Sequence, residues 1–300
     1  MTDLSPSEVL GLIDLASRLK AGTTRHDVDG KALALVFEKP SLRTRVSFEI
    51  AMSQLGGTSV VLGPDEVGLG TREPVADIAM VLSRYVDIIA ARVFNHSDVA
   101  ALAASATVPV INALSDLEHP CQTLADFLTL KERFGSLEGL TLAYVGDGNN
   151  VARSLALGCA MTGVNFRIAS PEGYQINADA IEAAATALTP GWSVQQINDP
   201  SKVAVGADVV YTDVWTSMGQ ESEQIDRREA FAGYQVSLET LGSAKPDAIF
   251  LHDMPAHRGE EIADGVMEDP RSAVFDQAEN RLHTQKALLA YLLDPTVLPN

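Results

Sequence analysis

A cluster of cationic and hydroxyl side chains occurs at Ser41-Leu42-Arg43-Thr44-Arg45. The cluster follows an apolar run over 31–37, typical of a buried strand, and precedes a run over 46–55 that is typical of a helix. Free backbone N–H groups and the positive end of the helix dipole gather at such a junction. Arginine adds a planar fork that can bind two oxygens of one phosphate. The segment therefore predicts a site for a small phosphate dianion.

Two further polar segments follow predicted strands. His119 and Gln122 begin a helical run, and their spacing of three residues lets both side chains face one ligand. Asp213 opens the loop Asp213–Gly219 after another apolar run, where a carboxylate can bind an ammonium group. Alone, the His119–Gln122 segment is equally typical of a helix cap or a core residue, and the Asp213–Gly219 segment is more typical of a helix cap or a turn.

Other candidates lie at the ends of apolar runs or near the C-terminus. Arg92 ends one run, His252-Asp253-Met254-Pro255 follows another, and Arg281 lies in the final helical segment. A helical arginine such as Arg281 is commonly a surface ion-pair partner. The glycine-rich turn Gly146–Asn150 lacks the GxGxxG spacing of dinucleotide-binding turns, which argues against a nucleotide-binding module.

Strand-like and helical patterns alternate along the chain in two series, which predicts parallel sheets covered by helices on both faces. Strand-like runs span 31–37, 58–62, 86–91 and 108–112, then 140–145, 164–169, 192–197, 208–212 and 248–251. Helical patterns span 5–20, 43–55, 74–84, 96–105, 119–134, 150–162, 177–188, 199–205, 237–242, 260–267 and 277–293.

The fold class expected is therefore α/β with two domains. The first covers residues 1–135, and the C-terminal helix at 277–293 packs back on it. The second covers residues 136–276. In parallel sheets, ligands bind beyond the carboxyl ends of the strands. The polar segments described above follow such ends.

Composition excludes several classes of protein. A net charge of −18 repels nucleic acid and anionic membranes. Two cysteines make neither a disulfide framework nor a metal site, and a reducing compartment is expected. The N-terminus lacks the basic region and apolar core of a signal peptide. The sequence also has no uninterrupted run of about 18 apolar residues, the length needed to span a membrane. We therefore expect a cytoplasmic protein without nucleic-acid or membrane partners.

Taken together and in this order, the motifs resemble the transcarbamylase family and, within it, the ornithine carbamoyltransferases. Ser41–Arg45 is similar to the carbamoyl phosphate motif, His119–Gln122 to the carbamoyl-group motif, and Asp213–Gly219 to the ornithine loop. The resemblance covers nearly the whole chain. It implies transfer of a carbamoyl group from carbamoyl phosphate to L-ornithine, giving L-citrulline and phosphate, in arginine biosynthesis or degradation. It also implies a homotrimer or a multiple of trimers, with no metal or organic cofactor.

The resemblance also assigns roles to individual residues. It makes the first domain the carbamoyl phosphate domain and the second the ornithine domain. The catalytic residues it implies are Arg92, His119, Gln122, Asp253 and Arg281. The carbamoyl phosphate ligands it implies are Ser41, Leu42, Arg43, Thr44, Arg92, His119, Gln122, Met254 and Arg281. The ornithine ligands it implies are Asn150, Asp213, Ser217, Met218 and Asp253.

Three positions depart from the family pattern, and one of them is Arg153, where a histidine is frequent. Asp253 stands where the family usually has cysteine beside the attacking amine. Its carboxylate could turn away and leave only backbone contacts, accept the proton of the amine, or select a different amine. Gly68 aligns with a glutamine that the family offers to a neighbouring subunit, and Arg72 is an alternative for that role.

Two rival functions remain open. The chain could be a transcarbamylase for another amine, such as putrescine, lysine or an acylated ornithine. It could also be a non-catalytic paralogue, although a structural protein has no need for this array of arginine, histidine and glutamine.

Overall fold

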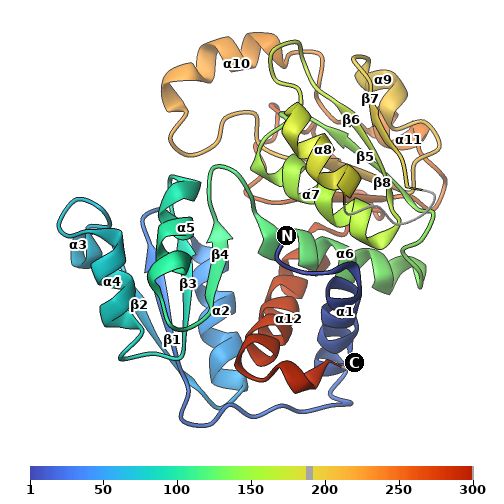
Figure 1. The fold of residues 1–300 in the computed structure, drawn as a ribbon. Helices are drawn as coiled ribbons and strands as arrows, with labels where there is room; N and C mark the ends of the chain where they lie inside the picture. Colours follow the sequence, from blue (N-terminus) through green and yellow to red (C-terminus); the bar gives the residue numbers. More distant parts are fainter. Residues whose placement is uncertain (187–191, 299–300) are drawn as a thin grey trace. The chain divides into compact units, whose positions relative to one another are not determined.

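The computed structural model describes residues 1–186 and 192–298, and its core is two parallel sheets (Figure 1). One sheet has the order β2-β1-β3-β4 and the other β7-β6-β5-β8-β9. The strands of the first sheet are β1 (Ala32–Phe37), β2 (Thr58–Leu62), β3 (Ile88–Arg92) and β4 (Val110–Leu114). The strands of the second are β5 (Thr141–Val145), β6 (Asn165–Ala169), β7 (Val194–Gln196), β8 (Val209–Thr212) and β9 (Ile249–His252). The predicted strands and their parallel pairing are confirmed.

Helices connect successive strands. The longer ones are α1 (Pro6–Lys20), α2 (Leu42–Gln54), α4 (Val75–Leu82), α5 (His96–Ser105), α6 (Pro120–Phe134), α7 (Asn150–Thr162), α8 (Ala178–Thr186) and α12 (Val274–Leu293). The shorter ones are α3 (Pro64–Val67), α9 (Pro200–Val203), α10 (Gln224–Ala230) and α11 (Leu238–Ser243), with 3₁₀ turns η1 (Glu221–Glu223) and η2 (Pro295–Val297). The chain therefore has the α/β fold that the alternating pattern predicts.

The chain divides into two compact units, each built on one sheet. We call Leu10–Leu128 with Glu279–Asn300 the four-stranded unit, and Met1–Val9 with Thr129–Ala278 the five-stranded unit. Most of α12 thus belongs to the four-stranded unit, where Lys20 Nζ donates to Asn280 Oδ1 at 2.8 Å. The C-terminal helix thus packs back on the four-stranded unit, as expected.

Burial on both faces explains why the central strands read as continuous apolar runs. In β3 all five residues are buried, and in β8 all four. The core of the five-stranded unit also holds stacked aromatic rings, with Tyr144 of β5 and Tyr211 of β8 5.7 Å apart. These rigid sheets give the polar loops at the strand ends a fixed base.

Register brings the ends of neighbouring strands to the same edge. Phe37 of β1 pairs with Arg92 of β3, so the loop leading to α2 begins beside Arg92. In the other sheet Thr212 pairs with both Val145 and His252. The loops after β5, β8 and β9 therefore start side by side.

The helix prediction differs from the structure in two respects, and one further part of it lies outside the described residues. The helix expected at 260–267 is wrong, because this segment forms turns and Ile262 bridges to Val236 and Arg258. Helices α3 and α10 are present but were not predicted. Of the helix expected at 177–188, residues 187–188 lie outside the described part of the chain.

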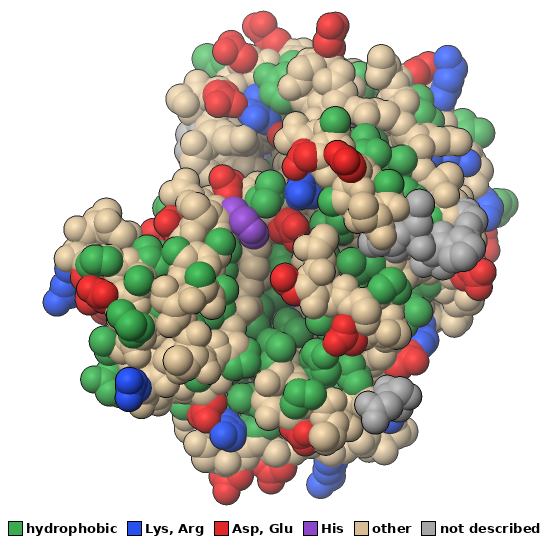
Figure 2. Space-filling model, viewed as in Figure 1, with side chains coloured by type: hydrophobic (Ala, Val, Ile, Leu, Met, Phe, Trp, Pro, Cys, Tyr) green, Lys and Arg blue, Asp and Glu red, His purple; other side chains and the backbone are tan. Residues whose placement is uncertain are grey.

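Acidic side chains are spread over the face of the molecule seen in Figure 2 rather than gathered in one patch. Within residues 1–186 and 192–298, no helix has the length and apolar character needed to cross a bilayer.

Gly148, in the loop after β5, tests how tightly this loop is packed. A Cβ at this position would lie 2.2 Å from the backbone nitrogen of Ile176. We expect Gly148→Ala to lower the free energy of unfolding by about 1–3 kcal/mol, since overpacking forces backbone shifts. Urea unfolding measures the loss. Gly242→Ala in α11 is the control, because nothing lies within 4 Å of its Cβ. Equal stability of both variants would contradict this packing.

Candidate active site

The N-terminus of α2 is shaped by its own hydroxyl groups. Ser41 is the N-cap, and its Oγ accepts a hydrogen bond from the backbone N–H of Thr44 at 3.3 Å. This cap satisfies one of the orphan N–H groups of the first turn. Thr44 is buried, whereas the side chain of Leu42 is exposed. The helix start therefore turns Thr44 into the unit and Leu42 out of it.

Two arginines from distant parts of the chain meet at Thr44. Its Oγ1 accepts hydrogen bonds from Arg92 Nη1 at 3.4 Å and from Arg281 Nη2 at 3.0 Å. Arg281 also donates through Nη1 to Gln122 Oε1 at 2.6 Å. Gln122 Nε2 in turn donates to Asp126 Oδ1 at 2.8 Å. Four predicted site residues, from α2, β3, α6 and α12, thus form one hydrogen-bonded cluster.

His119 lies beside this cluster and is kept neutral. Burial lowers the pKa of its imidazole well below 6.5, and the positive charges of Arg281, Arg92 and Arg43 lower it further. The charge of Arg43 therefore acts on the same imidazole ring as the charges of Arg92 and Arg281. At neutral pH the ring can donate one N–H without bringing a positive charge of its own.

Two other residues of the predicted motifs have no chemical role in this cluster. Burial raises the pKa of the Cys121 thiol to about 11, so at neutral pH it is not a thiolate nucleophile. Arg45 is exposed and pairs with Glu49 at 3.3 Å on the surface of α2. The positive charge that acts on His119 thus comes from Arg43, Arg92 and Arg281.

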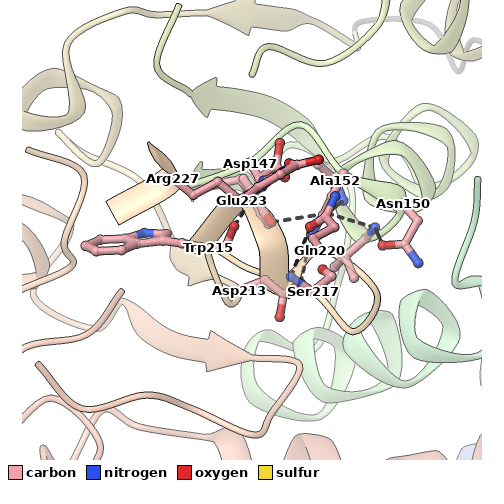
Figure 3. A network of polar contacts seen from close by, with 12 residues as sticks. Asp147, Asn150, Ala152, Asp213, Trp215, Ser217, Gln220, Glu223 and Arg227 are labelled. Carbon is pink, nitrogen blue, oxygen red and sulfur yellow. Dashed lines mark hydrogen bonds and ion pairs between the residues drawn. The ribbon is translucent and has the colours of Figure 1, made fainter. Parts of the chain in front are cut away.

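A second polar cluster lies at the carboxyl ends of the strands in the five-stranded unit. Asn149, the N-cap of α7, donates through Nδ2 to Asp213 Oδ2 at 2.9 Å. Its Oδ1 accepts the N–H groups of Val151 and Ala152. Asn149 thus links the helix start to the carboxylate, while Asn150 points away from Asp213 in Figure 3.

Asp213 is a buried carboxyl with an unusual charge environment. Burial, and after it the negative charge of Asp253, raises its pKa to about 7 against the opposing effects of His252 and Asn149. Asp253 is thus close enough to act on Asp213. A buried carboxylate of this kind favours a bound cation, because a cation restores its charged form.

The loop after β9, which carries Asp253, is held by a buried histidine. His252 Nδ1 accepts the N–H of Met254 at 2.7 Å, so its Nε2 carries the proton toward Glu261 Oε1 at 3.1 Å. Gln277 Oε1 accepts the backbone N–H of His252 at 2.9 Å. Met254 has a positive φ of 56°, a conformation that these contacts maintain. Met254 belongs to the five-stranded unit, whereas the other predicted carbamoyl phosphate ligands belong to the four-stranded unit.

The loop after β8 is partly exposed at its tip. Ser217 donates its backbone N–H to Gln220 Oε1 at 3.0 Å, and Met218 is exposed. Figure 3 shows Ser217 and Asp213 on the same stretch of this loop. The tip thus offers backbone and hydroxyl groups near the carboxylate.

One group of potential metal ligands occurs among the described residues, at His257, Glu260 and Glu261. Glu260 pairs with Arg228, and Glu261 accepts hydrogen bonds from His252 and the backbone of His257. The Oε1 atoms of both glutamates thus already serve protein contacts, whereas Oε2 of Glu261 is buried without a hydrogen-bond partner.

Three supporting residues were not predicted from the sequence. Asp126 orients the amide of Gln122, Asn149 contacts Asp213, and Glu261 fixes the tautomer of His252. The spacing of Gln122 and Asp126, four residues apart in one helix, is the signal that could have identified the first.

Comparison with known proteins covers both units. Residues 1–132 match the family model described as aspartate/ornithine carbamoyltransferase, carbamoyl-P binding domain, and residues 138–292 match the corresponding Asp/Orn binding domain. The chain is 56% identical over 297 residues to the ornithine carbamoyltransferase of Acidothermus cellulolyticus, covering 97% of this chain and 95% of that protein.

Solved structures agree with these matches. The ornithine carbamoyltransferase of Thermus thermophilus is 49% identical, with a TM-score of 0.89 over 98% of this chain and 97% of that one. A solved N-acetyl-L-ornithine transcarbamylase is less similar in sequence, at 32% identity, with a TM-score of 0.85 over 97% of each chain.

The charge around His119 can be measured by NMR titration of its ring. We expect a pKa below that of an unperturbed imidazole, and we expect Arg281→Gln to raise it, because one of three positive charges is removed. Arg45→Gln is the matched control and should leave it unchanged. A His119 pKa that did not respond to Arg281→Gln would contradict the convergence of these guanidiniums.

Proposed function

The chain belongs to the aspartate/ornithine carbamoyltransferase family, and we propose that it transfers the carbamoyl group of carbamoyl phosphate to the side-chain amine of L-ornithine. The products are L-citrulline and phosphate. The observation that carries the proposal is the hydrogen-bonded cluster of Thr44, Gln122, Arg92 and Arg281. The charge of Arg43 acts with those of Arg92 and Arg281 on the neighbouring, neutral His119. This arrangement suits a ligand that joins a phosphate dianion to a neutral carbonyl group.

The four-stranded unit binds carbamoyl phosphate in this proposal. The guanidiniums of Arg43, Arg92 and Arg281 hold the phosphate, together with the hydroxyl groups of Ser41 and Thr44 and the backbone N–H of Leu42. Arginine is suited to this because its planar fork matches phosphate oxygens. The existing hydrogen bonds of Thr44 to two of the arginines support a preformed site.

His119 and Gln122 act on the carbamoyl group. As the amine nitrogen attacks the carbonyl carbon, negative charge grows on the carbonyl oxygen, and the N–H of a neutral His119 donates to it. A fixed donor aimed at such an oxygen lowers the barrier by roughly 3–4 kcal/mol. The new C–N bond forms, the C–O bond to phosphate breaks, and the arginines stabilise the departing phosphate. The nitrogen, which has already lost one proton before it attacks, passes a second proton to the departing phosphate, which leaves as the hydrogen phosphate dianion.

The five-stranded unit binds L-ornithine. Asp213 pairs with the α-ammonium, and Asn150, Ser217 and Met218 hold the polar end of the amino acid. The raised pKa of Asp213 supports this role, because a carboxyl buried beside another carboxylate gains most from a cation. The free side-chain amine has a lysine-like pKa of about 10.4, so it must lose a proton before it attacks.

Asp253 is the residue that bears most on the choice of amine. Its charge reaches Asp213, which supports a place near the bound amino acid rather than a side chain turned away. We propose that it accepts the proton of the attacking amine. A carboxylate there also attracts an ammonium group, so the alternative is a preference for another amine, among putrescine, lysine and an acylated ornithine.

We further propose a cytoplasmic homotrimer, or a multiple of trimers. The four-stranded unit exposes an apolar stripe on α2, at Leu42, Val46 and Ile50, which suits contact with another copy of the chain. Figure 2 also shows hydrophobic side chains gathered over the region of α3 to α5. Gel filtration with light scattering measures the assembly.

Turnover with a panel of amines tests the function. We expect release of phosphate with L-ornithine and much slower release with putrescine, lysine or N-acetylornithine. Asp213→Asn should raise the KM for L-ornithine by about tenfold to a hundredfold, the worth of a charged hydrogen bond, with the KM for carbamoyl phosphate unchanged. Asp247→Asn, at an exposed loop, is the matched control. No turnover with any amine would favour a non-catalytic paralogue.

The pH dependence of binding tests the Asp213–Asp253 pair. The probe is L-2-aminopentanoate, which keeps the α-ammonium and carboxylate but lacks the side-chain amine. Below pH 7 Asp213 is protonated and cannot pair with the ammonium. The dissociation constant of the probe should therefore increase about tenfold for each unit by which the pH falls below 7, and it should stay constant above pH 7. Asp253→Asn should move this inflection to lower pH.

The same Asp253→Asn variant tests the base role. Turnover at saturating substrates should fall by about a hundredfold or more if Asp253 accepts the proton. A loss of less than about tenfold, below the usual general-base contribution, would end that role.

A further inference from the structure

Arg227 is a buried arginine that the proposed mechanism does not use. It lies on α10 and makes three hydrogen bonds, drawn in Figure 3. Its Nη1 donates to Asp147 Oδ2 at 2.7 Å and to the backbone carbonyl of Trp215 at 3.0 Å, and its Nε donates to Glu223 Oε2 at 2.9 Å. Its guanidinium carbon also lies 5.0 Å from the ring centre of Tyr174.

The partners of Arg227 lie on the two loops that carry the amino-acid site. Asp147 belongs to the loop after β5, two residues before Asn149, and Trp215 belongs to the loop after β8, two residues after Asp213. One guanidinium thus joins both loops. Asn149 joins them again, through its hydrogen bond to Asp213.

The link through Arg227 is costly to break. Asp147 is 8% exposed, and burial raises the pKa of its carboxyl while the hydrogen bond and charge of Arg227 lower it. Removing one partner from a buried ion pair leaves an uncompensated charge, which is strongly destabilising. Motion of either loop away from the other would break this pair.

The other contacts of Trp215 involve its side chain, so the position of its backbone depends on the hydrogen bond from Arg227. Its indole stacks on Phe231, 5.9 Å between ring centres, and its Nε1 is buried without a hydrogen-bond partner. The ring is therefore held by packing, which is not directional. The directional contact is the hydrogen bond from Arg227 to the carbonyl, which fixes where the chain leaves Asp213 for Ser217.

We propose that Arg227 is a positioning residue for the amino-acid site, which sets the distance between the Asn149–Asn150 segment and the Asp213–Ser217 segment. The inference rests on the proposed function, since it concerns the same ligand. A displacement of about 1 Å in such a site can cost as much as a hundredfold in rate. Lysine cannot replace the arginine, because its single ammonium lacks the planar fork that reaches Asp147, Trp215 and Glu223 together.

Kinetics of Arg227→Met test the positioning role. This variant keeps the apolar stem and removes all donors. We expect the KM for L-ornithine to rise about tenfold or more, with the KM for carbamoyl phosphate within about twofold of wild type. Arg228→Met is the matched control, because Arg228 is the next residue on α10 and pairs with Glu260 at the surface. Equal rises in both KM values, or no rise, would overturn the proposal.

A double variant separates positioning from stability. Arg227→Met alone leaves Asp147 buried without its cation, so its melting temperature should fall. Asp147→Asn in the same chain removes that charge and should recover part of the melting temperature, yet the raised KM for L-ornithine should persist. Recovery of the KM to within about twofold of wild type would reduce Arg227 to charge compensation and overturn the proposal.

Fluorescence supplies a readout that does not depend on turnover. In a Trp192→Phe background Trp215 is the remaining tryptophan, since the chain has two. We expect Arg227→Met to increase acrylamide quenching of Trp215 about twofold or more, as its loop loosens, and Arg228→Met to leave it unchanged. If wild type fails to carbamoylate L-ornithine, the proposed function fails while this measurement still stands. Unchanged quenching in Arg227→Met would refute the loop link itself.

Discussion

The structure depends on positive charge that is buried before any ligand arrives. Arg92 and Arg281 are 6% and 2% exposed, and both donate to the neutral oxygen of Thr44. Placing guanidiniums in a medium of low dielectric is costly unless other groups restore the lost hydration. The hydroxyl of Thr44 and the amide oxygen of Gln122 contribute to this, and neither of them carries a formal charge. Under the proposed function this buried charge is what the phosphate binds, and Asp126 keeps the Gln122 amide turned to accept from Arg281.

Two buried carboxyl groups of the five-stranded unit, those of Asp147 and Asp213, have partners of different charge. Asp147 receives the guanidinium of Arg227, so its charge is matched within the protein. Asp213 instead receives an amide hydrogen of Asn149, a dipole rather than a cation, and Asp253 adds further negative charge. The first carboxylate is matched within the fold, and under the proposed function the second is matched by the ammonium group of the ligand. That contrast points to the Asp213 side of the unit as the place for an ammonium group.

Local pattern predicted most of the fold, because strands buried on both faces read as continuous apolar runs. It failed where long-range contacts decide the structure. The segment 260–267 has helical composition, but buried Glu261 is held by His252 and Gly265 takes a φ of 85°, so turns form instead. The arginine motifs predicted an anion site. Local pattern could not predict their meeting, because Arg281 and Thr44 are 237 residues apart, and the expectation that they share a ligand came from the family resemblance.

Arg227 and Arg228 show why supporting residues escape such reasoning. They are neighbours of one type on a short polar helix, yet one is buried against Asp147 and the other pairs with Glu260 at the surface. No apolar periodicity marks α10, so neither the helix nor its inward face stands out in the sequence. The chain carries 40 acidic residues against 22 lysines and arginines, so surface carboxylates far outnumber their cations. Attraction to these carboxylates favours an arginine at the surface. The buried guanidinium of Arg227 must therefore be held in the interior by its specific hydrogen bonds.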